Sequence, residues 1–230
     1  MWPFFNNFSS LLDQLIGQGI VPIVTGLNPR SDSTSAALWV PTYNALVRGM
    51  AEARQIPFIN LYEASVGLAN LGLKSDGLHG NTYTAGGAQP CVFTAAGLAY
   101  NYNVRNLLTL QVLDAVRPLI VDASAPAPDA ETPPLEGAGS PSQPFAIAQL
   151  PFTHAADTSQ STHSTFNSYP ACQADQDESG PEYVYRFVLA APTAVRIAVF
   201  DDSAVDVDLH LLGADAAVAS CIARRQIDAI

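Results

Sequence analysis

The chain has 230 residues, of which 48% are hydrophobic and only 13% are charged, yet its formal net charge is -11. This composition supports a buried core, and the lack of a basic patch argues against nucleic acid as a partner. The apolar runs at 20–24 and 197–200 are far shorter than the ~20 residues that span a bilayer, so we expect no transmembrane segment.

The negative charge lies in the second half of the chain. Residues 1–121 carry six basic and six acidic residues, whereas residues 122–230 carry four and fifteen. Residues 122–144 are rich in proline and in small and acidic residues, a composition that favours an extended, disordered linker. We therefore predict two modules, 1–121 and 145–230, joined by the linker 122–144.

The first module alternates helical and strand patterns. The expected elements, in chain order, are a helix from about Asn7 to Gly17, a strand at 20–25, a loop at 27–35, a helix at 37–55, a strand at 57–62, a loop at 73–92 and a final helix ending before Pro118. Asn7 or Ser9 is the expected cap of the first helix and Thr94 that of the last segment. This order is typical of an α/β fold, in which helices cover a parallel sheet.

Beyond the linker the pattern changes to period two. Apolar residues alternate with polar ones at 182–190, 194–200 and 205–212, which predicts an antiparallel β module, a sandwich. Asp206, Asp208 and His210 occupy the polar positions of the last segment, and we expect them at the surface.

The cysteines and the acidic stretch at 175–180 give no metal site. Cys91, Cys172 and Cys221 fit no metal-ligand spacing; Cys172 and Cys221 can form a disulfide or remain thiols, and the sequence leaves both open. Residues 175–180 match the start of a calcium loop, but Arg186 stands where a bidentate glutamate is needed, so a solvated turn is favoured. No metal or cofactor is predicted.

The stretch KSDGLHGN at 74–81 carries the chemistry. In it His79 can act as a general base, with Asp76 as the carboxylate that fixes its tautomer and stabilises the imidazolium. Gly77 lets the loop turn tightly between them. An Asp-x-x-His pattern arises readily by chance, but this one follows a predicted parallel strand, where α/β folds place active sites.

Three stretches, in the same order as in the family, resemble the SGNH/GDSL hydrolases. The first, GIVPIVTGLNPR, resembles the family's fourth strand and the loop after it, and the second, YNALVRGMAEARQIPFINLYEA, resembles the following helix and fifth strand. The third, SDGLHGN, resembles the terminal Asp-x-x-His block. The resemblance runs from about Phe8 to Val116. It implies part of a flavodoxin-like three-layer hydrolase domain. It also implies lipase- or esterase-like hydrolysis of a small-molecule, lipid or carbohydrate ester, with His79 as catalytic base and Asp76 as its partner.

The Gly-Asp-Ser block that carries the family's nucleophile has no counterpart here, nor do its oxyanion blocks. Ser33 and Ser35 lack the flanking motif, and Asn6 and Asn7 are interpreted as helix caps rather than oxyanion donors. We therefore expect the chain to begin after the family's third block, to be inactive alone and to need a complementing N-terminal segment. The strand at 20–25 would then present an unpaired edge, which predicts poor stability or association.

The second module resembles the bacterial pre-peptidase C-terminal β-sandwich at LPFTHAADTS (150–159), ESGPEYVYRF (178–187) and VDVDLHLL followed by Cys221. The match stops before the last strands, so this domain is expected to be incomplete. The resemblance implies a secreted or cell-surface protein whose signal peptide is not in this chain. The alternative is a noncatalytic extracellular binding or adhesion protein with a degenerate hydrolase remnant.

Overall fold

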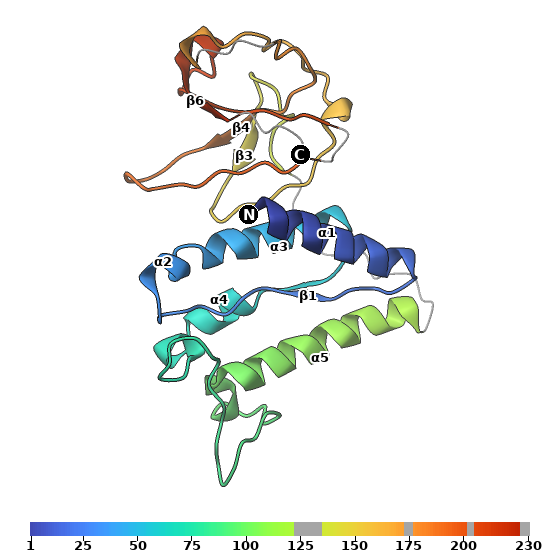
Figure 1. Cartoon of the computed structure of the whole chain (residues 1–230), viewed down its shortest axis with the longest axis vertical. Coiled ribbons are helices and arrows are strands. Elements are labelled where there is room, and N and C mark those ends of the chain that lie inside the picture. Colours follow the sequence, from blue (N-terminus) through green and yellow to red (C-terminus); the bar gives the residue numbers. More distant parts are fainter. Residues whose placement is uncertain (122–134, 173–176, 202–204, 226–230) are drawn as a thin grey trace. The chain divides into compact units, whose positions relative to one another are not determined.

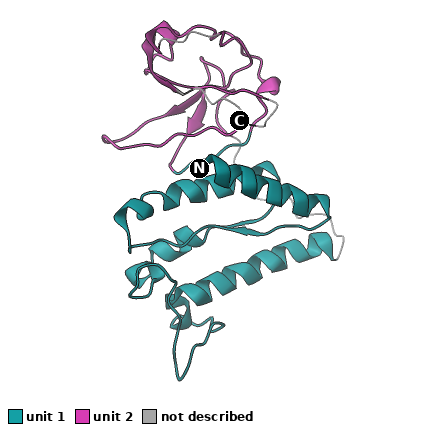
Figure 2. Ribbon diagram, in the orientation of Figure 1, with its two compact units in different colours: residues 1–132, 151–155 teal, residues 133–150, 156–230 magenta. Residues whose placement is uncertain are grey.

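The computed structural model describes residues 1–121, 135–172, 177–201 and 205–225. The chain divides into two compact units, which are described separately (Figure 2). Unit 1 contains residues 1–132 and 151–155, and unit 2 contains residues 133–150 and 156–230. Among the described residues no helix combines the length and the apolar character needed to cross a bilayer.

Unit 1 has a short parallel sheet between helices (Figure 1). Its helices are α1 (Trp2–Gly17), α2 (Thr34–Ala37), α3 (Val40–Ala53), α4 (Leu61–Val66) and α5 (Asn101–Ile120), with 3-10 turns at Ala69–Gly72 and Gly97–Ala99. Strand β1 (Val24–Thr25) pairs in parallel with β2 (Phe58–Ile59), so that Val24 lies opposite Phe58. Figure 1 shows α1 and α3 on one side of the strands and α5 on the other.

The core of unit 1 lies between α1, α3 and the sheet. Leu12, Val24, Val47 and Met50 form its buried centre, and the partly buried side chains packed against it are Phe5, Phe8, Leu46, Ile56 and Phe58. The helical spacing of these residues directs one stripe of each helix at the same face of the sheet. The expected order of helix, strand, helix, strand, loop and helix is present in α1, β1, α3, β2 and α5, and the short helices α2 and α4 were not predicted.

The ends of several elements differ from the prediction. Helix α1 begins at Trp2 with Pro3 in its first turn, where a missing N–H costs nothing, so the prediction that Asn7 or Ser9 caps it was wrong. Helix α5 continues past Pro118 to Ile120, because a proline in the last turn removes only one hydrogen bond. Thr94 accepts a hydrogen bond from Gly97 N (3.3 Å), but Tyr100 is the N-cap residue of α5, so the prediction that Thr94 caps this segment was wrong.

The strand expected at 57–62 is cut short by a helix. Strand β2 ends at Ile59, and the Asn60 side chain then accepts a hydrogen bond from Glu63 N (3.3 Å), which caps α4. An asparagine followed three residues later by glutamate is a helix-start signal that the apolar pattern of this stretch obscured.

The described residues of unit 2 form two separate pairs of strands. Strand β3 (Phe145–Ile147) runs parallel to β4 (Tyr185–Phe187), and β5 (Leu209–Leu212) is antiparallel to β6 (Cys221–Arg225). Single 3-10 turns lie at Thr158–Gln160, Pro170–Cys172 and Val218–Ser220. A disulfide between Cys172 and Cys221, with Cα atoms 5.6 Å apart, resolves the alternative that the sequence left open.

Two expectations for unit 2 differ from the structure. Residues 194–200 form no strand, and the β3–β4 pair is parallel rather than antiparallel. Alternation alone does not make a strand, because a ladder also needs a partner backbone at the right distance. Residues 135–144, assigned to the linker, form turns that bond to the sheet region, with Val184 N donating to Gly139 O (2.8 Å). The rest of the predicted linker, 122–134, lies outside the described residues.

A polar cluster is buried beside β5 and β6. The Glu178 carboxylate, with 6% of its side chain exposed, lies 3.2 Å from Arg224 Nη1 and 3.4 Å from His210 Nε2. The His210 ring stacks on Tyr169 with centroids 3.7 Å apart. Asp208 Oδ1 is also buried, so the prediction that Asp208 and His210 are surface residues was wrong. Alternation placed them on an outer face, but Tyr169 and Glu178 cover that face.

Burial shapes the protonation of this cluster. Desolvation, with the Glu178 carboxylate beside it, raises the pKa of Asp208 from 3.8 to about 6. Desolvation lowers the pKa of His210 from its usual 6.5, against the opposing effect of Glu178. As the pH rises, the ionisation of Asp208 therefore lowers the free energy of unfolding of unit 2, whereas the deprotonation of His210 raises it.

We predict that Asp208→Asn removes one of these pH dependences. Because the folded-state pKa of Asp208 is raised, its contribution to the free energy of unfolding is complete below about pH 4 and is lost as the pH rises through about 6. The variant should protect the β5–β6 amides from hydrogen exchange better than the parent chain at pH 7, with the difference vanishing near pH 4. Asp206→Asn, the same charge change at an exposed site, should keep most of the parental fall, because burial and Glu178 raise the pKa of Asp208 more than Asp206 does. Equal pH profiles for the parent and Asp208→Asn would contradict the prediction.

Candidate functional site

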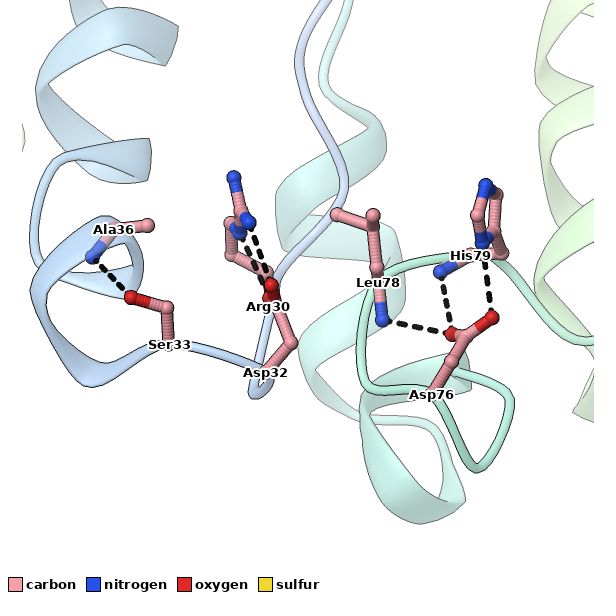
Figure 3. A network of polar contacts seen from close by, with 7 residues as sticks. All are labelled: Arg30, Asp32, Ser33, Ala36, Asp76, Leu78 and His79. Atoms are coloured by element: carbon pink, nitrogen blue, oxygen red, sulfur yellow. Dashed lines mark hydrogen bonds and ion pairs between the residues drawn. The ribbon is translucent and has the colours of Figure 1, made fainter.

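Asp76 and His79 are in direct contact in the loop between α4 and α5 (Figure 3). Asp76 Oδ2 lies 2.9 Å from His79 Nδ1. The other oxygen, Oδ1, accepts hydrogen bonds from the backbone N–H groups of Leu78 (2.9 Å) and His79 (3.0 Å). Since an ionised carboxylate only accepts hydrogen bonds, His79 Nδ1 carries the proton and its Nε2 is left to act as a base. The sequence-predicted pair is thus brought together.

The electrostatics of the loop suit this arrangement. The backbone N–H of His79, followed by that of Leu78 and by the imidazole itself, holds the pKa of Asp76 well below its usual range. Asp76 therefore stays ionised at neutral and mildly acidic pH, where it can stabilise a charged imidazole. The side chains are open to solvent, with 64% of His79 and 47% of Asp76 exposed.

Gly77 connects this loop to the one that follows β1. It has a left-handed φ of +69°, and its carbonyl oxygen accepts hydrogen bonds from Ser31 N (2.7 Å) and Asp32 N (3.2 Å). A Cβ at this position would lie 2.7 Å from Asp32 N and from Ser31 Oγ. The glycine that the sequence analysis assigned to a tight turn is thus required both by its backbone angle and by the close approach of the second loop.

A buried asparagine anchors the other end of the loop. Asn101, at the start of α5 and 1% exposed, donates from Nδ2 to Ser65 Oγ (2.8 Å) and to Asn28 Oδ1 (3.1 Å), while its backbone N–H donates to Asn81 Oδ1 (2.8 Å). Gly80 packs so closely that a Cβ there would lie 2.2 Å from Asn101 Oδ1. Asn101 therefore joins α4, the loop after β1 and the His79 loop.

This network was not predicted from the sequence, although Asn28 follows the strand expected at 20–25. Nor was the ion pair between Arg30 and Asp32, with contacts of 2.9 and 2.7 Å. The pair lies in the loop beside Asp76 and His79 (Figure 3). An Arg-x-Asp spacing in a loop was the available signal, since a planar guanidinium pairs with a carboxylate in this bidentate manner.

Ser33, one of the two serines weighed above as a nucleophile, has a structural role. Ser33 Oγ accepts a hydrogen bond from Ala36 N (3.3 Å) and caps α2. Asn6 and Asn7 lie within α1 and do not cap it. Within the described residues, no three His, Cys, Asp or Glu side chains are arranged to hold a metal ion. In the acidic stretch, Asp177 accepts from Ser179 N (3.0 Å), and Asp175 lies outside the described residues.

We predict that Gly77→Ala destabilises unit 1 more than Gly86→Ala does. Both glycines have left-handed φ angles, which cost an alanine roughly 1–2 kcal/mol, but a Cβ on Gly86 meets open space. Gly77→Ala should cost about 1–2 kcal/mol more, because it also displaces the two hydrogen bonds to the Gly77 carbonyl. Urea unfolding followed by tryptophan emission measures this, since Trp2 and Trp39 both lie in unit 1. Equal costs would show that the loops do not depend on this close approach.

Comparison of the chain with protein-family models, curated proteins and solved structures finds no match. Support for a function therefore comes from the geometry of Asp76, His79 and the loops that hold them, and from the resemblance of the sequence to the SGNH/GDSL hydrolases.

Proposed function

We propose that the chain supplies the base half of a serine hydrolase of the SGNH/GDSL type, which cleaves ester bonds. The observation that carries the proposal is the contact of 2.9 Å between Asp76 Oδ2 and His79 Nδ1, with the imidazole exposed beyond it. His79 would take the proton from a serine hydroxyl as that oxygen attacks the ester carbonyl, and would return it to the leaving alkoxide. Asp76 would hold the tautomer and stabilise the imidazolium.

The nucleophile is assigned to a complementing N-terminal segment. Ser33, which follows the strand-and-loop stretch of the resemblance, uses its hydroxyl oxygen as a helix cap, and no described serine hydroxyl forms a hydrogen bond with His79. The same observation favours the second candidate, a noncatalytic binding or adhesion protein that retains a degenerate hydrolase loop. The two candidates differ in whether His79 Nε2 meets a serine when the segment is present.

The proposed location is outside the cell or on its surface. The support is the resemblance of unit 2 to pre-peptidase C-terminal domains and the Cys172–Cys221 disulfide, since disulfides persist mainly in oxidising compartments. The proposed substrate is a small-molecule, lipid or carbohydrate ester.

The test combines the chain with the polypeptide encoded immediately upstream and measures hydrolysis of p-nitrophenyl acetate. If that polypeptide carries a Gly-Asp-Ser block, we predict that the pair is active and that His79→Ala lowers kcat by roughly 10²–10⁴, the usual contribution of a general base. Asp76→Ala should lower it less, because the base itself remains. His163→Ala, which removes a histidine of unit 2, should leave kcat unchanged.

Two outcomes would contradict the proposal. One is full activity of the His79→Ala variant in an active pair. The other is labelling of a serine in this chain by a fluorophosphonate probe, which would place the nucleophile here. An upstream sequence without a Gly-Asp-Ser block would favour the noncatalytic candidate.

A further inference from the structure

The loop after β1 presents two polar side chains on one of its sides. Asn28 and Arg30 are half-buried, whereas Pro29 between them is buried. The residue before a proline is held in extended backbone, and in extended backbone alternate side chains share a face. Asn28 and Arg30 therefore project to the same side of the loop, with Cα atoms roughly 7 Å apart.

A chain of hydrogen bonds fixes which way round the Asn28 amide lies. Ser65 Oγ uses its only proton to donate to Leu61 O (2.7 Å), so it can only accept from Asn101 Nδ2 (2.8 Å). The second N–H of that Asn101 group donates to Asn28 Oδ1 (3.1 Å). Because the Asn28 oxygen faces Asn101, its Nδ2 group is turned away from the buried network. Within the described part of the chain no acceptor meets the two protons of that group.

Arg30 is held in a similar way, by one edge of its guanidinium. Its Nε and Nη2 donate to Asp32 at 2.9 and 2.7 Å. The two protons of Nη1 and the second proton of Nη2 have no acceptor among the described residues. The Asp32 carboxylate is occupied by the same ion pair. Asn28 and Arg30 together therefore present N–H donors in fixed positions and no acceptor.

These donors lie beside the proposed base. The backbone N–H groups of the two residues after Arg30 donate to Gly77 O, which joins this loop to the loop that carries His79. Figure 3 shows the side chains of Arg30, Leu78 and His79 extending to the same side of the two loops. Leu78 is 41% exposed, so an apolar surface lies next to the imidazole. The two loops thus combine a base, an apolar surface and a group of donors.

We propose that Asn28 and Arg30 bind a carboxylate group of the substrate, so that the site takes esters that carry a negative charge near the scissile bond. This assignment rests on the proposed function, because it concerns the ester that His79 would cleave. Carboxylate oxygens only accept hydrogen bonds, which matches a surface that only donates them, and a guanidinium binds a carboxylate through one planar edge. Asp32 and Asp76 already place negative charge in these loops, which favours a singly charged carboxylate over a doubly charged phosphate.

NMR of the side-chain N–H groups of the full chain tests this binding without a serine or a complementing segment. The probe is monomethyl succinate, an ester with one carboxylate, and its control is dimethyl succinate, which has the same skeleton and no charge. Monomethyl succinate should shift the signals of Asn28 Nδ2 and Arg30 Nε, and dimethyl succinate should not. Methyl phosphate should bind more weakly than monomethyl succinate.

Two variants separate binding from support of the fold. Asn28→Asp should abolish the binding, because Oδ1 can still accept from Asn101 while a second carboxylate oxygen replaces the donor. Arg30→Gln should raise Kd about tenfold or more, since it removes charged hydrogen bonds to the probe. Arg48→Gln, which removes the arginine that pairs with Glu52 within α3, should leave Kd unchanged.

Several results would overturn the carboxylate subsite: no shift with monomethyl succinate, equal shifts with dimethyl succinate, tighter binding of methyl phosphate, or an unchanged Kd in Asn28→Asp. Failure of the proposed function is a separate result, because a complemented chain without esterase activity leaves the binding to the chain measurable. Conversely, an active pair that hydrolyses p-nitrophenyl acetate as fast as mono-p-nitrophenyl succinate would refute the subsite alone.

Discussion

The parallel pairing of β1 with β2 is the constraint on which the rest of unit 1 depends. Parallel strands end at the same edge of their sheet, so the chain after Thr25 and the chain after Ile59 leave from one edge. Backbone groups beyond the strand ends cannot join the ladder and must find other partners. Two of them, the N–H groups of Ser31 and Asp32, meet on the Gly77 carbonyl. The Asp76–His79 pair is held beside the loop after β1 for this reason.

Buried amide side chains provide hydrogen bonds that a sheet of two short strands cannot provide. Asn44 binds both the N–H (2.6 Å) and the C=O (3.2 Å) of Leu27, in place of a neighbouring strand. On the other side of the site, the Asn101 side chain donates to Asn28 Oδ1 and Ser65 Oγ, and its backbone N–H donates to Asn81 Oδ1. An amide both donates and accepts, so one side chain can satisfy several buried groups that would each be costly if left alone. A rigid buried frame can therefore present an exposed acid–base pair.

Unit 2 is held together by a covalent link and a buried ion pair as well as by its strands. Its two short strand pairs are supplemented by the Cys172–Cys221 disulfide and by the buried carboxylate of Glu178 between His210 and Arg224. A buried charge is tolerated only when it is paired and hydrogen-bonded, and removing one partner leaves the other exposed to the full cost of desolvation. Tyr169, far from His210 in the sequence, stacks on the imidazole ring. The stability of this unit therefore depends on the protonation of buried groups at β5.

The sequence by itself determined the order of α1, β1, α3, β2 and α5 in unit 1, the change to period-two alternation in the second half, and the loop that carries Asp76, Gly77 and His79. These features follow from spacing and turn chemistry, which act between neighbours along the chain. Only the tertiary structure decided the parallel β3–β4 pair, the disulfide, the roles of Asn101 and Arg30, and the burial of Asp208 and His210. Each of these depends on groups brought from distant parts of the chain, and a polar residue looks the same in a sequence whether water or a buried partner satisfies it.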